Sequence, residues 1–219
     1  MVGLEPSCIA VFRDELINLF PHDEDAKRLA QQTFTLAEFL EKKVPGYRPP
    51  ALYRKAIIHG HCHQKAIMKL ESERSLYSKV GLDCEVLDSG CCGMAGSFGF
   101  QAEHYQISQQ VGSLVLLPAV TRAPADTLLV ADGFSCREQI AQSTSRHALH
   151  TAEVLNMALS EGPLGSEHGC PEARILLRRE RAVAEVLQRT WAGVLIVAGA
   201  MLFTTFLLRR RRQHARLSV

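Results

Sequence analysis

The sequence predicts an α/β fold, in which a parallel-sheet, cysteine-rich domain is followed by a C-terminal transmembrane helix. Short apolar, β-branched runs alternate with helical patterns, as in folds built from parallel strands and crossover helices. Parallel strands joined in this way point in one direction, so the residues that follow them meet at one edge of the sheet. Four such runs are each followed by cysteine, at Cys8, at Cys62, at Cys91 with Cys92, and at Cys136.

In the first half of the domain, helical spacing and stop signals define the elements. Pro21 ends the first helix, and Asp23 opens the acidic first turn of the second, which ends before Pro45. Gly81 is placed to cap the helix that follows the second strand. The predicted elements are a strand at 2–4, helices at 9–20 and 23–44, a strand at 55–60, and a helix at 62–80 interrupted near 71–75.

The second half continues the alternation of strands and helices. Pro118 is expected to end the helix before the last strand. The glycines and prolines of residues 161–173 predict a linker, so the cysteine-rich domain is expected over residues 1–160. The predicted elements are strands at 84–88 and 127–131, and helices at 103–117, 135–142 and 147–159.

Charge divides the chain into an acidic body and a basic tail. Residues 1–173 carry 15 Lys and Arg against 21 Asp and Glu, whereas residues 174–219 carry ten Arg against two Glu. An acidic body lacks the basic surface that phosphate binding requires, which argues against nucleic acid as its partner. Residues 174–189 are expected to form a basic amphipathic helix, and a basic segment beside an apolar run indicates a membrane.

The apolar run predicts a transmembrane helix over residues 190–208. Its 19 residues carry no charge. A helix of this length spans nearly the ~30 Å hydrocarbon core of a bilayer. A buried core helix is the alternative, but Arg189 and the basic tail at 209–219 are better suited to the membrane interfaces. Seven cysteines, an odd number, and a first segment without a signal-peptide pattern predict free thiols and a cytoplasmic globular domain.

Thiols that converge at one sheet edge are typical of an iron-sulfur cluster held by cysteine thiolates. The loop around Cys91 and Cys92 is rich in glycine, which lets backbone amides approach anionic sulfur. A zinc site is the main alternative, although the CxxC spacing of structural zinc sites does not occur in the sequence. Core packing of single cysteines and phosphate binding by the loop are weaker alternatives. Cys84, at the far end of its strand, and Cys170, in the linker, are excluded from the site.

Histidines and carboxylates also lie near the cysteines. His59, His61 and His63 flank the second cysteine site, where an imidazole could ligate iron or donate a hydrogen bond to sulfur. A polar loop is the preferred interpretation of these histidines. Glu5 and Asp132 precede the first and last cysteine sites, and solvated loop charges are preferred there over a proton relay.

Four motifs follow one another along residues 1–158. They are Gly3-Leu-Glu-Pro-Ser-Cys8, His61-Cys62-His63, Gly90-Cys-Cys-Gly-Met-Ala-Gly-Ser-Phe-Gly99 and Gly133-Phe-Ser-Cys136-Arg-Glu-Gln-Ile140. Together they resemble the CCG cysteine-rich domain that occurs in the B component of heterodisulfide reductase and in the iron-sulfur components of glycolate oxidase and anaerobic glycerol-3-phosphate dehydrogenase. The chain looks most like the C-terminal part of an FAD-linked oxidase with an iron-sulfur region. It departs from many relatives at Gly133, where they have the first cysteine of a CxxC pair.

The resemblance implies that Cys8, Cys62, Cys91, Cys92 and Cys136 ligate a [4Fe-4S] cluster, of cubane or non-cubane type. It also implies an electron-transfer module of a flavin-linked 2-hydroxy-acid dehydrogenase or oxidase, of the glycolate, D-lactate or D-2-hydroxyglutarate type. Electrons would pass from FAD, on a partner flavoprotein or an upstream region, towards a membrane acceptor such as a quinone. No catalytic residue for substrate oxidation is expected in this chain. The alternatives are a zinc-binding or metal-free docking module, and a thiol-disulfide enzyme that works without iron.

Overall fold

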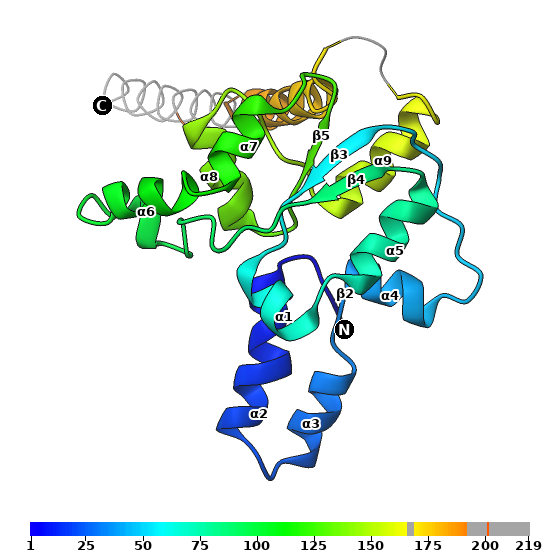
Figure 1. Ribbon diagram of the computed structural model, residues 1–219, viewed down its shortest axis with the longest axis vertical. Helices are drawn as coiled ribbons and strands as arrows, with labels where there is room; N and C mark the ends of the chain where they lie inside the picture. Colours follow the sequence, from blue (N-terminus) through cyan, green and yellow to red (C-terminus); the bar gives the residue numbers. More distant parts are fainter. Residues whose placement is uncertain (166–168, 192–200, 202–219) are drawn as a thin grey trace, which may run out of the picture. The chain divides into compact units, whose positions relative to one another are not determined.

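The computed structural model describes residues 1–165, 169–191 and 201 of the 219-residue chain (Figure 1). The chain divides into two compact units, Met1–Ala173 and Arg174–Val219. The first unit mixes helices with parallel strands, which confirms the predicted α/β class.

A three-stranded parallel sheet lies at the centre of the first unit (Figure 1). Its order is β4 (Asp83–Val86), β3 (Lys55–Ile58) and β5 (Leu128–Val130), so the middle strand comes first along the chain. Ile58 is the register partner of both Val86 and Val130, and the three strands therefore end level with one another. The segments that follow them leave from a single edge, as the sequence predicts for the cysteine sites.

The first predicted strand belongs to a different sheet. β1 (Val2–Gly3) pairs in parallel with β2 (Phe34–Thr35) in a sheet of two strands, so the prediction of one sheet with four strands was wrong. The predicted helix at 23–44 is likewise divided by β2. Thr35 ends that strand and caps the next helix, because its side chain accepts the N–H of Glu38 while the Glu38 carboxylate accepts the N–H of Thr35. The two helices are α3 (Glu24–Gln31) and α4 (Leu36–Lys43).

Two helical segments near the predicted cysteine sites include π-helical turns. The first runs through α1, η1 and α2, and α2 packs beside α3 (Figure 1). The second precedes α5, which ends at Gly81 in a left-handed conformation, as predicted (φ +94°). Such wider turns are often found at functional sites. The segments are α1 (Pro6–Ala10), η1 (Val11–Glu15), α2 (Leu16–Leu19), η2 (Gln64–Met68) and α5 (Glu71–Val80).

The predicted helix at 103–117 is two helices, and Pro118 does not end it. Pro118 lies in the first turn of the second of them, where a missing N–H leaves no intrahelical hydrogen bond unmade. The remaining helices follow the predicted order around the sheet (Figure 1). They are η3 (Phe98–Phe100), α6 (Tyr105–Gly112), α7 (Leu116–Arg122), α8 (Phe134–Ser143) and α9 (Thr151–Glu161).

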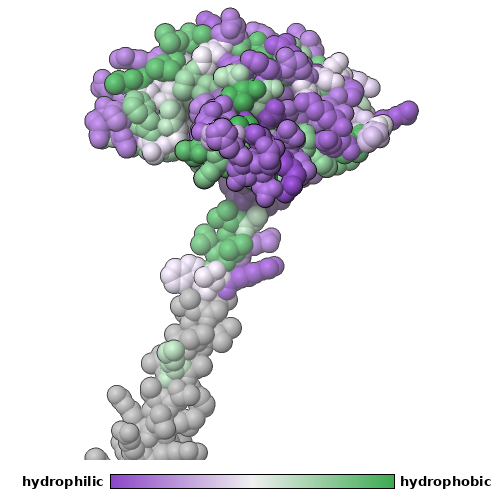
Figure 2. All heavy atoms as spheres, turned by 90° about the horizontal axis from the view of Figure 1, so that it is seen from below, coloured by the Kyte–Doolittle hydropathy of each residue, from purple (hydrophilic) through white to green (hydrophobic). Residues whose placement is uncertain are grey.

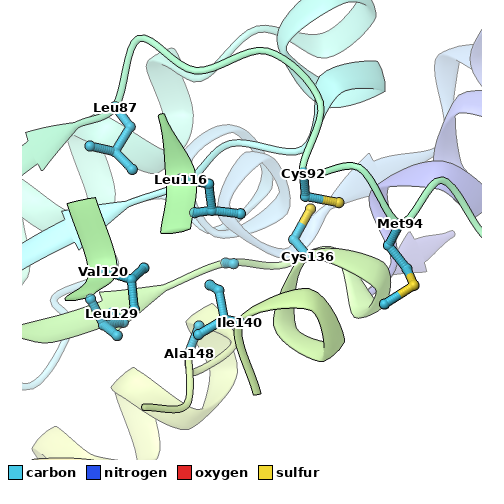
Figure 3. Close-up of a cluster of buried hydrophobic side chains, with 10 residues drawn as sticks. Leu87, Cys92, Met94, Leu116, Val120, Leu129, Cys136, Ile140 and Ala148 are labelled. Atoms are coloured by element: carbon cyan, nitrogen blue, oxygen red, sulfur yellow. The ribbon is translucent and has the colours of Figure 1, made fainter. Parts of the chain in front are cut away.

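The hydrophobic core reaches from α7 and β5 to two of the predicted site cysteines. Cys92 and Cys136 are both buried in this cluster, with sulfur atoms that point towards one another (Figure 3). The site is therefore walled on one side by apolar side chains that exclude water. The buried members are Leu87, Cys92, Met94, Leu116, Val120, Leu129, Ala131, Cys136, Ile140 and Ala148.

In the second unit, residues 174–191 are helical. Arginines recur at positions 174, 178, 181 and 189, which lie on one face of a helix, whereas Leu177, Val183 and Leu187 are exposed apolar residues. Figure 2 shows hydrophobic residues in green beside hydrophilic ones in purple along this helix. Most of the predicted transmembrane segment at 190–208, and all of the tail at 209–219, lie outside the described residues. Within the described part, no helix has the length and apolar character that membrane crossing requires.

Candidate metal centre

The backbone places three of the predicted ligands at the starts of helices. Cys8 is the third residue of α1, and Cys136 is the third residue of α8. Cys62 opens the helical segment that continues as η2. Cys91 and Cys92 lie in the loop after β4. The amino end of α8 carries the partial positive charge of the helix dipole, which favours the thiolate form of cysteine.

Four of the five predicted ligands form one chain of contacts. The Cys62 thiol is hydrogen-bonded to Cys91, Cys91 to Cys92, and Cys92 to Cys136. The structure therefore brings together thiols from the ends of β3, β4 and β5, which are separated in sequence by up to 74 residues. The strand-end pattern predicts this convergence for five thiols, and the structure shows it for these four but not for Cys8, whose strand belongs to the other sheet.

Three cysteines lie apart from this chain of thiols. Cys8 is exposed, and no contact among the described residues joins it to the other four; its neighbour Ser7 lines the cavity beside them. Cys84 is half-buried on β4 and lines a separate cavity of about 350 Å³ together with Lys55 and Thr127. Cys170 is half-buried in the segment that was predicted as a linker.

Along the chain of thiols, pKa values are alternately raised and lowered. Hydrogen bonds from Cys62 and then from Cys92 lower the pKa of Cys91 far below its usual range. The hydrogen bond from Cys92 lowers the pKa of Cys136, and the neighbouring His59 lowers it further. The pKa values of Cys62 and Cys92 are raised, because each thiol donates to a neighbouring sulfur and because Cys92 is buried and Cys62 partly buried. Since the thiolate is the metal-binding form of cysteine, Cys91 and Cys136 are the two thiols that the protein itself prepares to bind a metal.

A cavity of about 350 Å³ lies beside the thiols. Its wall combines thiols and imidazoles with the glycine-rich loop, where Ala95 has φ +44° and Gly96 has φ +65°. The Gly96 N–H donates to Ser135 Oγ, which fixes this loop against the start of α8. The lining residues are Ser7, His61, Cys62, His63, Cys91, Cys92, Ala95, Gly96 and Ser135.

The histidines beside Cys62 have different environments. His59 is 2% exposed, and its Nδ1 lies 2.8 Å from Ser89 Oγ. His61 is 7% exposed, lines the cavity, and has no hydrogen-bond partner for its Nδ1. His59 and His61 lie in the loop after β3, as the polar-loop interpretation expects, but both side chains are buried rather than solvated. His63 is exposed, but it lies in the helical segment that Cys62 opens and not in the loop.

Glu5 and Asp132 are not solvated charges, as the sequence suggested, but links between loops. Glu5 accepts hydrogen bonds from Ser7 in its own helix and from the Phe134 N–H, 2.7 Å away at the start of α8. Asp132 accepts the N–H and the hydroxyl of Thr151, at 2.8 and 2.7 Å. The hydrogen bond between Glu5 and Phe134 joins residues that are 129 positions apart in the sequence, and it holds the Cys8 segment beside the Cys136 segment.

Sequence reasoning also missed two supporting residues. The Lys65 ammonium donates to the backbone oxygen of Ser89, just before the paired cysteines. The Ser89 hydroxyl in turn contacts His59. The sequence does show Lys65 three residues after Cys62 on a predicted helix. It does not show that the partner of Lys65 is Ser89, because tertiary contacts set that pairing.

The donor set fits a thiolate-bound cluster. Contacting thiols, lowered pKa values, a neighbouring cavity and a buried imidazole nitrogen without a partner occur together at one edge of the sheet. Within the described ranges of the chain, no group of three or more His, Cys, Asp or Glu side chains is arranged to hold a metal ion. The side chains thus fit a cluster by the chemistry of their donor atoms, and in this structure the four thiols contact each other directly.

Fold and site together define an α/β protein with parallel sheets and a set of contacting cysteine thiols at the carboxyl edge of one of them. No model of a known protein family matches the chain. The chain is similar to several characterised proteins. This similarity is consistent with the group that the four motifs resemble, the iron-sulfur regions that accompany FAD-linked oxidases.

Three relatives illustrate the range of sequence identity and of matched length. The C component of the anaerobic glycerol-3-phosphate dehydrogenase of Escherichia coli K12 is 32% identical over 164 residues, which is 73% of this chain and 40% of that protein. The D-2-hydroxyglutarate dehydrogenase of Pseudomonas putida is 26% identical over 157 residues, 71% of this chain and 15% of that protein. Lactate utilization protein A of Geobacillus kaustophilus is 27% identical over 171 residues, 68% and 66% of the two chains. The chain thus spans less than half the length of the first two relatives.

Proposed function

We propose that this chain is an iron-sulfur electron-transfer module of a flavin-linked dehydrogenase or oxidase. The observation that carries the proposal is the set of four contacting thiols from three strand ends, beside a cavity. The relatives support the oxidoreductase class, because their names refer to glycerol-3-phosphate, D-2-hydroxyglutarate and lactate. The substrate of the complete enzyme is accordingly a 2-hydroxy acid, of the glycolate, D-lactate or D-2-hydroxyglutarate type, or a related alcohol.

In this proposal Cys62, Cys91, Cys92 and Cys136 hold a [4Fe-4S] cluster, and Cys8 is the fifth ligand. When bound, the cluster supplies one-electron transfer. Glu5 keeps the segment with Cys8 beside α8 through its hydrogen bond to Phe134. The apolar side chains around Cys92 and Cys136 exclude water, and the amino end of α8 stabilises negative charge on sulfur.

Substrate oxidation is assigned to a flavoprotein partner, as a separate protein or as a region of a longer one. The lengths of the relatives support this division, since the chain matches 40% of one and 15% of another. We further propose that residues 190–208 anchor the chain in a membrane, with the cysteine-rich domain in the cytoplasm and a quinone as the electron acceptor. The uncharged composition of the segment supports this anchor.

Metal analysis of anaerobically purified full-length chain tests the proposal. We expect Cys91→Ser and Cys92→Ser to lose most of the bound iron, because each removes a thiolate from the chain of contacts. Cys84→Ser and Cys170→Ser are matched controls, since both residues are half-buried and lie outside the chain of contacts, and they should retain the iron. Equal iron retention in all four variants would overturn the assignment. Zinc in place of iron would favour a structural docking module instead.

A further inference from the structure

A histidine in the wall of the cavity beside the thiols has a buried ring nitrogen without a hydrogen-bond partner. His61 is 7% exposed, and its Nδ1 has no hydrogen-bond partner. A buried polar atom left without a partner loses the hydrogen bonds that it would make in water, so native proteins seldom retain one without a reason. The residues that share the cavity wall with His61 include Cys62, Cys91 and Cys92. The buried side chain therefore lies in the same cavity wall as three of the thiols.

Gly133 makes room for this ring. A Cβ at position 133 would lie 2.5 Å from His61 Cδ2 and 3.2 Å from Cys136 Sγ. The backbone of Gly133 has φ −69° and ψ 129°, which any residue adopts readily, so glycine is needed here for space and not for backbone freedom. The imidazole thus packs against the position that begins α8, next to the Cys136 sulfur.

Other contacts hold His61 in this place. Its backbone oxygen accepts the Lys65 N–H at 2.9 Å, at the start of the helical segment after β3. Its ring packs against that of His63, with 5.4 Å between the ring centroids.

We propose that His61 is a ligand of the cluster through Nδ1, so that the centre has mixed thiolate and imidazole coordination. This inference rests on the proposed function. The neutral imidazole donates the Nδ1 lone pair and keeps its proton on Nε2, so no electron or proton is transferred when the bond forms. A neutral imidazole adds less negative charge to the centre than a thiolate at position 61 would, so it makes the centre easier to reduce and raises its reduction potential. His59 also has a buried ring nitrogen without a hydrogen-bond partner, Nε2, but it is not among the residues that line the cavity, and its Nδ1 is engaged with Ser89.

The test compares nitrogen coupling and reduction potential in the iron-loaded full-length chain. Pulsed EPR of the reduced protein should show a strongly coupled nitrogen, as for iron-bound imidazole, in the unmodified chain and in His63→Gln. His63 is the matched control, because it lines the same cavity but is exposed. In His61→Gln the coupling should disappear. In His61→Cys iron should be retained, the coupling should be lost, and the reduction potential should fall, because a thiolate replaces a neutral ligand.

The outcomes separate this inference from the proposed function. Iron-loaded protein without a strongly coupled nitrogen, or with a coupling unchanged in His61→Cys, would overturn ligation by His61 and leave the proposed function intact. A chain that binds no iron would overturn both. The His61→Cys variant keeps the test valid if His61→Gln fails to fold, since it replaces a buried ring by a smaller side chain that can bind iron.

Discussion

Replacing Gly133 by Ala tests how tightly the candidate metal centre is packed. The new Cβ would lie 2.5 Å from His61 Cδ2, so the ring has to move. Overpacking of this kind costs about 1–3 kcal/mol. Gly133 is also the N-cap of α8, where alanine is less favourable than glycine by about 0.5–1 kcal/mol. A total of about 1.5–4 kcal/mol lowers the Tm of a domain of this size by roughly 3–16 °C.

The assay is thermal unfolding of the full-length chain in detergent, followed by circular dichroism. Gly90→Ala is the matched control, because Gly90 adjoins Cys91 and a Cβ there meets nothing within 4 Å. We expect the control to unfold within about 2 °C of the unmodified protein. Equal Tm values for Gly133→Ala and Gly90→Ala would refute the reasoning, since His61 would then have room that the structure denies it.

Three further predictions concern other parts of the chain. Glu172→Ala should lower the free energy of unfolding by about 3–5 kcal/mol in urea titrations, because it leaves the buried Arg146 guanidinium without the carboxylate 2.7 Å away. The control is Asp25→Ala, which removes an exposed partner of Arg28 and should change the free energy of unfolding by less than about 1 kcal/mol. Burial raises the pKa of Glu73 to about 7 from 4.5, so stability should fall as the pH rises from 4.5 to 7. Glu73→Gln, which can still accept hydrogen bonds from Thr35 and Gln64, should weaken that pH dependence, and an unchanged profile would contradict the assignment. The full-length chain should resist carbonate extraction, whereas a version that ends at residue 189 should be released, and release of both would exclude the anchor.

The sheet that positions the site was predictable because its strands are short apolar runs with clear boundaries. β3, β4 and β5 were all expected near their observed positions, and their parallel order follows from the helices between them. β2 was missed because a strand of two residues has no detectable periodicity. It forms only through pairing with β1, a tertiary contact between residues about 32 positions apart, such as Val2 and Phe34.

The thiols were easier to predict than the groups that support them. Cys62, Cys91, Cys92 and Cys136 follow strands, so the topology alone brings them together. His61 looked like an ordinary loop residue, and its burial depends on the space left by Gly133, 72 positions later in the chain. Pairings over such distances are set by the packed fold, and no local pattern in the sequence encodes them.

Reductive titration of the anaerobically purified full-length chain shows whether the protein carries a redox-active iron-sulfur cluster. Iron and acid-labile sulfide are measured together, and the protein is then titrated with reductant while EPR spectra are recorded. The account predicts about four irons and four sulfides per chain and a reversible one-electron signal, without turnover of a 2-hydroxy acid by the chain alone. Zinc, or no metal, in a folded chain would contradict it, as would substrate oxidation in the absence of iron and flavin.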